Sequence, residues 1–252
     1  GGGLIALKLD KQNGELTEWW TNDEGPLGQT ASESAPSIAD LDGDGTPEVV
    51  MGFSAVTHTG QIWNGLNDGP AGGQRSNNAV TSVVDLDGAM GMNNNRDLEI
   101  VSGNKAKKLD GSLLWDASDK VGDGYSAVGD FGNDDKPEVV TVTNGDVYVL
   151  NGQNGDIIFG PTGIPGGGEG GPPTIADFDG DGNIEFAAAG RGQYTVYDLD
   201  CQGSMPDMST CASQSTDGIL WSKSVQDLSS SRTGSSVFDF EGDGKAEVVY
   251  ND

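Results

Sequence analysis

Short runs of β-branched, aromatic and other apolar residues alternate along the chain with polar segments rich in Gly, Asp and Asn. Four such runs follow one another at residues 125–130 (YSAVGD), 137–143 (PEVVTVT), 146–152 (DVYVLNG) and 156–160 (DIIFG). The same order returns at residues 172–177, 184–190, 193–200 and 218–224. Runs of this length and composition, bounded by turn residues, are typical of β-strands. The pattern therefore predicts a repeated unit of four strands.

An acidic loop joins the first run of each unit to the second. These loops start at Asp40, Asp85, Asp130, Asp177 and Asp239, at intervals of 45, 45, 47 and 62 residues. A period near 45 residues with four strands per repeat is typical of a propeller blade. We therefore expect an all-β fold, a β-propeller of four-stranded blades. The repeats start near residues 35, 80, 125, 172 and 234.

The two ends of the chain each carry part of a repeat. Residues 4–20 match the third and fourth runs of a unit, whereas the C-terminus supplies a first and a second run. Either further blades follow Asp252, or the two ends complete one blade between them and close a five-bladed ring. The start at Gly1 and the stop just after a second run indicate a mature or trimmed fragment. Residues 1–252 are thus expected to be one propeller domain or part of one.

The chemistry of the loops is visible in the first copy. Asp40, Asp42 and Asp44 alternate with small or apolar residues, and Glu48 follows eight residues after Asp40. The carbonyl of Thr46 offers a further oxygen. Several hard oxygen ligands in a flexible loop suit Ca²⁺, whereas Mg²⁺ takes fewer protein ligands and Zn²⁺ prefers His or Cys. The loop predicts a calcium site.

Two other interpretations of these loops compete with a calcium site. A single loop of Asp and Gly is often only a solvated turn, but five copies at a regular period are not. An EF-hand needs a helix on each side and a Glu at loop position 12. That position holds Met51, Thr141, Ala188 and Tyr250 in the loops without an insertion, and the flanking residues are β-branched. The EF-hand is excluded.

The element (I/V)-x-D-(L/F)-D-G-D-G-x-x-E-(V/F)-(V/A) resembles the FG-GAP/VCBS repeat family over nearly the whole chain. The resemblance implies a calcium-binding propeller, usually seven-bladed, as in integrin α-subunits and secreted bacterial surface proteins. In that family the side chains at loop positions 1, 3, 5 and 9 and the carbonyl at position 7 hold Ca²⁺.

The resemblance implies complete ligand sets in three loops: Asp40, Asp42, Asp44, Thr46 and Glu48; Asp177, Asp179, Asp181, Asn183 and Glu185; Asp239, Glu241, Asp243, Lys245 and Glu247. The second loop keeps Asp85, Asp87 and Glu99 around an insertion that puts Asn95 at position 5. The third keeps Asp130, Asp134 and Glu138, with Gly132 at position 3 and Asp135 where Gly is usual. Both altered loops are expected to bind Ca²⁺ more weakly, and the third is the one expected to be empty, as a plain turn.

The chain is strongly acidic, with 40 Asp and Glu against 13 Lys and Arg and a formal net charge of −27. Nucleic acid and anionic membrane surfaces are therefore not expected partners. Without an apolar run of 18 residues, no membrane insertion is expected either. Because the acidic loops repel one another without a cation, we expect folding and calcium binding to be coupled.

The only two cysteines, Cys201 and Cys211, lie close together in the segment CQGSMPDMSTC. In a calcium-rich repeat protein a disulfide is the expected state, and a pair of free surface thiols is the alternative. Calcium and cysteine usage together indicate an extracellular or cell-surface protein, secreted by a bacterium.

Signals for catalysis are sparse. His58 is the only histidine, so a His-based catalytic group would rest on it alone. We expect Trp20, Trp115 and Trp221 to pack between blades rather than to hold a cofactor. We therefore expect a non-enzymatic adhesion or recognition propeller. Its protein or glycan partner would bind the face opposite the calcium loops, at loops such as 67–78 and 161–173. A self-assembling subunit of a surface filament, a lectin-like propeller and an accessory module of a secreted enzyme are alternatives.

Overall fold

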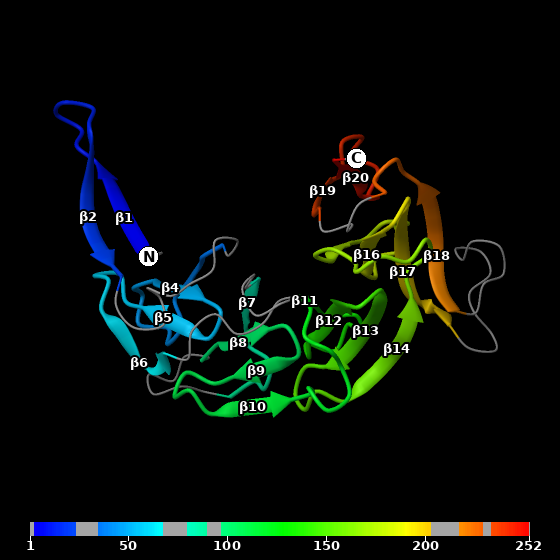
Figure 1. Ribbon diagram of the computed structural model, residues 1–252, viewed down its shortest axis with the longest axis horizontal. Coiled ribbons are helices and arrows are strands. Elements are labelled where there is room, and N and C mark those ends of the chain that lie inside the picture. Colours follow the sequence, from blue (N-terminus) through cyan, green and yellow to red (C-terminus); the bar gives the residue numbers. More distant parts are fainter. Residues whose placement is uncertain are drawn as a thin grey trace. The chain divides into compact units, whose positions relative to one another are not determined.

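The computed structural model describes residues 3–23, 35–67, 80–89, 97–202, 217–228 and 233–251. Throughout this described part the regular structure is β-strand, and no helix that could cross a membrane occurs in it (Figure 1). The chain divides into two compact units, residues 1–116 and 117–252.

The first unit holds a two-stranded sheet, β1–β2, and two four-stranded sheets, β3–β4–β5–β6 and β7–β8–β9–β10. Its strands are β1 (Leu4–Leu9), β2 (Leu16–Asn22), β3 (Ser37–Ala39), β4 (Glu48–Met51), β5 (Ser54–Val56), β6 (Ile62–Asn67), β7 (Thr81–Val84), β8 (Glu99–Ser102), β9 (Lys105–Lys107) and β10 (Leu113–Asp116).

The second unit holds the four-stranded sheets β11–β12–β13–β14 and β15–β16–β17–β18 and the two-stranded sheet β19–β20. Its strands are β11 (Tyr125–Gly129), β12 (Glu138–Thr143), β13 (Asp146–Asn151), β14 (Ile157–Gly163), β15 (Thr174–Ala176), β16 (Glu185–Gly190), β17 (Gln193–Gln202), β18 (Asp217–Ser224), β19 (Ser235–Phe238) and β20 (Glu247–Tyr250).

The predicted all-β unit of four strands is confirmed. In each four-stranded sheet, neighbours in sequence are neighbours in space and pair antiparallel, for example Glu138 with Asn151 and Ser126 with Thr141. The predicted hairpin at residues 4–20 is the sheet β1–β2. The closure of these sheets into a propeller stays a prediction.

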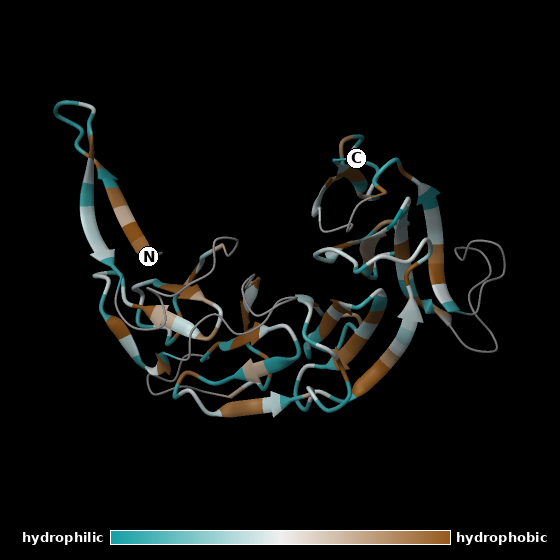
Figure 2. Ribbon diagram, viewed as in Figure 1, coloured by the Kyte–Doolittle hydropathy of each residue, from teal (hydrophilic) through white to brown (hydrophobic). Residues whose placement is uncertain are grey.

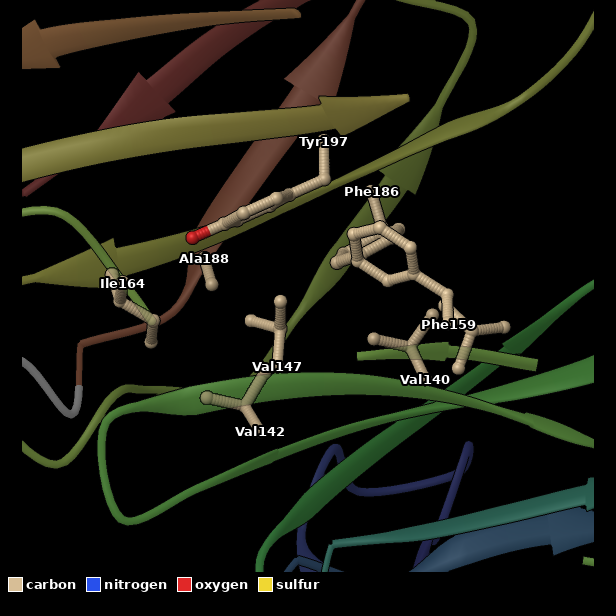
Figure 3. Packing of buried hydrophobic residues seen from close by; sticks show 9 residues of the cluster. Val140, Val142, Val147, Phe159, Ile164, Phe186, Ala188 and Tyr197 are labelled. Atoms are coloured by element: carbon tan, nitrogen blue, oxygen red, sulfur yellow. The ribbon is translucent and has the colours of Figure 1, made fainter. Parts of the chain in front are cut away.

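The core of the second unit lies between its sheets. Val140, Val142 and Val147 of the green sheet face Phe186 and Tyr197 of the yellow sheet (Figure 3). The rings of Phe186 and Tyr197 stack with centroids 5.0 Å apart, and both side chains are fully buried. All six residues of β12 are buried, as are all six of β16. Both faces of these strands are therefore covered, and even Thr141 and Thr143 of β12 are buried.

A similar core joins the two four-stranded sheets of the first unit. Leu41, Val50 and Phe53 of the first sheet pack with Ile100 of the second. On the other face of the first sheet, Trp20 packs against a small cluster of Met51 and Val56. Apolar residues thus concentrate on the strands and hydrophilic residues at the loops (Figure 2). The predicted packing role of Trp20 agrees with this contact.

Candidate metal centres

Each acidic loop connects the first strand of a sheet to the second, as the sequence predicts. The connections are residues 40–47, 85–98, 130–137, 177–184 and 239–246. In an antiparallel sheet with neighbouring strands in order, the first and third connections lie at the same edge. The end of β17 therefore reaches the same edge as the acidic loop of its sheet.

The first Asp of each loop holds the turn together. Asp40 accepts the amide of Asp44 at Oδ1 (3.0 Å) and that of Gly45 at Oδ2 (2.8 Å). Asp177 accepts the amides of Gly180 and Gly182 in the same way. Gly45 and Gly182 have φ of 91° and 93°, which glycine adopts without steric cost. The first carboxylate thus fixes the loop as a compact turn around itself.

The closing Glu of every loop makes one recurring contact. Its Oε2 accepts the backbone amide of the second loop residue, from Leu41 to Glu48 (3.0 Å), Leu86 to Glu99 (2.8 Å), Phe131 to Glu138 (3.0 Å), Phe178 to Glu185 (2.7 Å) and Phe240 to Glu247 (2.8 Å). The Glu side chains of the four-stranded sheets are buried, with exposures of 3%, 1%, 8% and 1% in chain order. The sequence therefore places a buried carboxylate at a fixed orientation below each of these four loops.

Three loops gather carboxylates around one point. In each, a first-position Asp, a third-position Asp and the closing Glu offer oxygens within 4.8 Å of one another: Asp40, Asp42 and Glu48; Asp85, Asp87 and Glu99; Asp177, Asp179 and Glu185. Among the described residues these are the only acidic groups with that spacing. Such close like charges need a cation or protons to neutralise them.

Unsatisfied buried oxygens indicate that a cation fits. Glu99 Oε1 and Asp179 Oδ2 are buried and receive no hydrogen bond within the described residues. Burial raises the pKa of Glu99 to about 7, and the carboxylates of Asp87, Asp97 and Asp85 add to the rise against the opposing Leu86 amide. Burial likewise raises the pKa of Glu185 to about 8, with Asp179, Asp198 and Asp177 nearby. Oxygen-only clusters of this kind match a hard divalent cation.

The predicted ligands at positions 5 and 7 are joined by a hydrogen bond within the loop, and their role as metal ligands stays a prediction. Asp44 and Asp181 lie outside the three-carboxylate groups, and each accepts the amide two residues on, from Thr46 (2.7 Å) and Asn183 (2.8 Å). Asp134 and Asp243 hold the amides of Lys136 and Lys245 in the same way. Asn95 lies outside the described residues, as does Cys211, so its ligand role and the disulfide stay predictions.

Two loops do not gather three carboxylates in the described structure. The Asp130 loop has Gly132 at position 3, and the sequence predicts it to be the weakest site. The Asp239 loop carries the predicted set Asp239, Glu241, Asp243 and Glu247, but these side chains are not brought within the same spacing. Glu247 is only half-buried because β19–β20 is a two-stranded sheet.

Sequence reasoning missed three residues beside the clusters. Asp97 lies two residues before Glu99, at the place of position 7, and its Oδ1 is buried without a hydrogen bond among the described residues. Lys108 Nζ lies 2.6 Å from Asp87 Oδ2. Asp198 is 5% exposed, and burial raises its pKa to about 6, with Asp200 and Asp179 contributing. Counting back from Glu99 would have found Asp97, whereas Lys108 and Asp198 depend on strand register.

A cavity of about 280 Å³ adjoins the Asp177 loop within the second unit. It is lined by Phe131, Asn133, Asn183, Ile184, Asp198 and Asp200 among others. Asn133 Nδ2 donates to Asn183 Oδ1 (2.6 Å), and Asn183 Nδ2 donates to Asp200 Oδ2 (3.3 Å). Amide and carboxylate groups in a shallow cavity can bind hydroxyl-rich ligands. The cavity lies beside an acidic loop, whereas the sequence predicts that the partner binds the loops on the opposite face, such as 67–78 and 161–173.

His58 lies in the exposed turn between β5 and β6, and its carbonyl accepts the indole N–H of Trp20 (2.8 Å). Trp221 lies edge-on to Phe178, with ring centroids 6.4 Å apart. Trp221 also belongs to a cluster that includes Val237 and Val248 of β19–β20, so both tryptophans pack between sheets, as predicted.

No family model matches the chain, and no curated protein matches it. Solved structures similar to the chain include the V. cholerae biofilm matrix protein Bap1, with 17% identity over 89% of the chain and a TM-score of 0.52. A rhamnogalacturonan lyase from Bacillus licheniformis matches 98% of the chain at 20% identity with a TM-score of 0.54. An Agrocybe aegerita lectin, reported to recognise non-reducing terminal N-acetylglucosamine, matches 99% of the chain at 15% identity with a TM-score of 0.51. This match covers 71% of the length of the lectin.

These similarities concern the all-β fold alone. The chain spans 36% of the length of the matrix protein and 38% of the length of the lyase.

Proposed function

We propose that the chain is a calcium-stabilised β-propeller module of the FG-GAP/VCBS type, with an extracellular, non-catalytic role in adhesion or recognition. The observation that carries the calcium part is the recurrence of a carboxylate cluster, with a buried closing Glu, at the same place in three of the four-stranded sheets. A bound Ca²⁺ would offset the excess negative charge of each cluster. Its ligands would be Asp40, Asp42 and Glu48 in the first loop, with the equivalent residues in the other two.

The protein's own residues define what the cation does. The first Asp and the closing Glu lie at the end of one strand and the start of the next, so an ion between them ties two strands together. Oxygen ligands without His or Cys favour Ca²⁺ over Zn²⁺. Removal of Ca²⁺ should therefore destabilise the sheets rather than abolish a chemical step. Differential scanning fluorimetry with Ca²⁺ and with a chelator tests this, and an unchanged melting temperature would refute the calcium role.

The proposed partner is a glycan. This choice is supported by the likeness to a sugar-recognising lectin and to a biofilm matrix protein, and by the polar cavity beside the Asp177 loop. The test is a glycan array with the full chain, followed by titration of any hit with Asn133→Ala and Asp200→Ala. We expect either variant to weaken binding about tenfold, as loss of a hydrogen bond to a buried ligand does. Asn154→Ala, in the exposed turn between β13 and β14, is the control. Binding that survives both cavity substitutions would place the glycan elsewhere, for example at the opposite loops.

A second candidate is a module of a polysaccharide-cleaving enzyme, because the lyase match covers 98% of the chain. Incubation with rhamnogalacturonan and chromatography of the products separates the two candidates. Shortened polysaccharide products would support the enzyme. Binding without cleavage would support the recognition module. Two other outcomes need separate assays. A pull-down would reveal a protein partner, and light scattering would reveal self-assembly into a filament.

A further inference from the structure

The third strand of each four-stranded sheet places one residue opposite the closing Glu of the second strand. Glu138 pairs directly with Asn151. In the other sheets the strand pairing ends one residue short of the Glu, at Val49 with Val56, Ile100 with Lys107 and Phe186 with Tyr197. Continuing the antiparallel register by one residue brings Glu48 opposite Thr57, Glu99 opposite Lys108 and Glu185 opposite Asp198. This cross-strand position is therefore neutral in two sheets, positive in one and negative in one.

Lys108 acts directly on its cluster. Its Nζ lies 2.6 Å from Asp87 Oδ2, and its hydrogen bond to Asp87 holds its pKa above the ordinary value. The carboxylates of Glu99 and Asp97 also act on this ammonium group. One positive charge is thus already present in a cluster of four carboxylates. It contacts one oxygen of Asp87, which belongs to the three-carboxylate group of this loop.

Asp198 has the opposite effect on its cluster. Its side chain is 5% exposed, and its charge acts on Glu185 and Asp179. The negative charge of Asp198 therefore adds to those of Asp177, Asp179 and Glu185, and the opposing charge that acts on Asp179 is that of Lys245 in the next acidic loop, not of a residue on the third strand. Asp179 Oδ2 is one of the buried oxygens without a hydrogen bond in the described residues.

We propose that the residue opposite the closing Glu sets how strongly each acidic loop requires Ca²⁺. Lys108 is a resident counter-ion that makes the Asp85 loop the weakest of the three clusters and the least dependent on the metal. Asp198 makes the Asp177 loop the tightest cluster and the most dependent. Thr57 leaves the Asp40 loop between them. This inference rests on the proposed calcium role.

The test compares Lys108→Met with Asp198→Asn in the full chain. Calcium affinities come from calorimetric titration, and melting temperatures are measured with a chelator and with Ca²⁺. Lys108→Met should raise the Ca²⁺ affinity of one class of site about tenfold, because it removes the repulsion between a positive charge and the divalent ion at close range. In chelator, the melting temperature of this variant should be lower than that of the wild type, and Ca²⁺ should raise it by more. Asp198→Asn should lower the Ca²⁺ affinity of one class of site about tenfold. In chelator its melting temperature should be higher than that of the wild type, and Ca²⁺ should raise it by less.

Two controls separate a role in calcium binding from a structural one. Lys108→Arg keeps the charge and should behave as the wild type. Lys105→Met removes the ion pair between Lys105 of β9 and Asp116 of β10 (2.9 Å), which involves none of the cluster carboxylates, and should leave every calcium affinity unchanged. If Lys108→Met lowers the melting temperature equally with and without Ca²⁺ and leaves the affinities unchanged, Lys108 is only an ion-pair partner and the inference is wrong. If the wild type itself binds no Ca²⁺, the proposed calcium role fails instead.

Discussion

The backbone amide of Phe178 donates a hydrogen bond of 2.7 Å to Glu185 Oε2, which ties the second residue of the acidic loop to the start of the next strand. The same contact recurs in all five acidic loops. One oxygen of each closing Glu is thereby committed to the protein. A glutamine can keep this hydrogen bond but offers a metal less charge.

Glu185→Gln is therefore expected to keep the fold and lose calcium. We expect the affinity of one site to fall by about 2 kcal/mol, roughly thirtyfold, as for loss of a charged ligand group. Calorimetric titration measures it. Glu247→Gln is the matched control, because it changes the same loop position in a loop whose carboxylates do not come together. Equal losses in both variants would contradict the assignment of the metal to the three clusters.

The stability of the metal-free protein should depend on pH through Glu99 and Glu185. Their pKa values in the folded chain are about 7 and about 8, above the ordinary 4.5, because burial disfavours the charged form. The folded state therefore holds these protons more tightly than the unfolded state. This contribution to stability is complete below pH 4.5 and is lost as pH rises through 7 to 8.

The expected result in chelator is a melting temperature that falls between about pH 5 and pH 8. With saturating Ca²⁺ the carboxylates are ionised as ligands, so this fall should disappear or reverse. Fluorimetry at matched ionic strength measures both series. Glu185→Gln should flatten the chelator series, and a slope that Ca²⁺ leaves unchanged would exclude these two groups as its cause.

The sequence predicts the strands well because the pattern that forms them is local. Residues 125–160 and 172–224 each read as four runs, and four strands form there. The ligand sets were less predictable. The Asp239 motif is the more regular one, yet the Asp85 loop, with its insertion, gathers its acids. Neighbouring strands bury Glu99, whereas Glu247 lies in a two-stranded sheet and is only half-buried. A loop motif does not contain those neighbouring strands.

Lys108 and Asp198 show the same limit. Each is far in sequence from the loop it affects, and only the register between the second and third strands brings it to the cluster. A shift of one residue in that register would turn either side chain to the other face of the sheet. The spacing within the loop carries no information about this register.

The inter-sheet core should be independent of calcium. Phe186 is fully buried and stacks on Tyr197, so Phe186→Ala removes a large apolar side chain and leaves a cavity. We expect a loss of about 3–5 kcal/mol in the free energy of unfolding, with and without Ca²⁺. Urea unfolding monitored by tryptophan fluorescence measures it. Ile158→Ala, at a position 47% exposed, should cost little. A loss confined to chelator would mean that the metal clusters, not this core, hold the two sheets together.

Backbone conformation in the Asp130 loop provides the last prediction. Asn133 and Asp135 have φ of 50° and 60°, where the Asp40, Asp177 and Asp239 loops carry glycines. Asp135→Gly removes the cost of this left-handed conformation and one negative charge, and it keeps the amide that donates to Asp130 Oδ2 (2.9 Å). We expect a gain of about 1 kcal/mol in stability, measured by urea unfolding. Gly45→Ala is the reverse experiment, because φ there is 91° and an added Cβ meets nothing within 4 Å. It should lose about 1 kcal/mol from conformation alone. If Asp135→Gly is neutral while Gly45→Ala is destabilising, interactions of the Asp135 side chain offset its backbone strain.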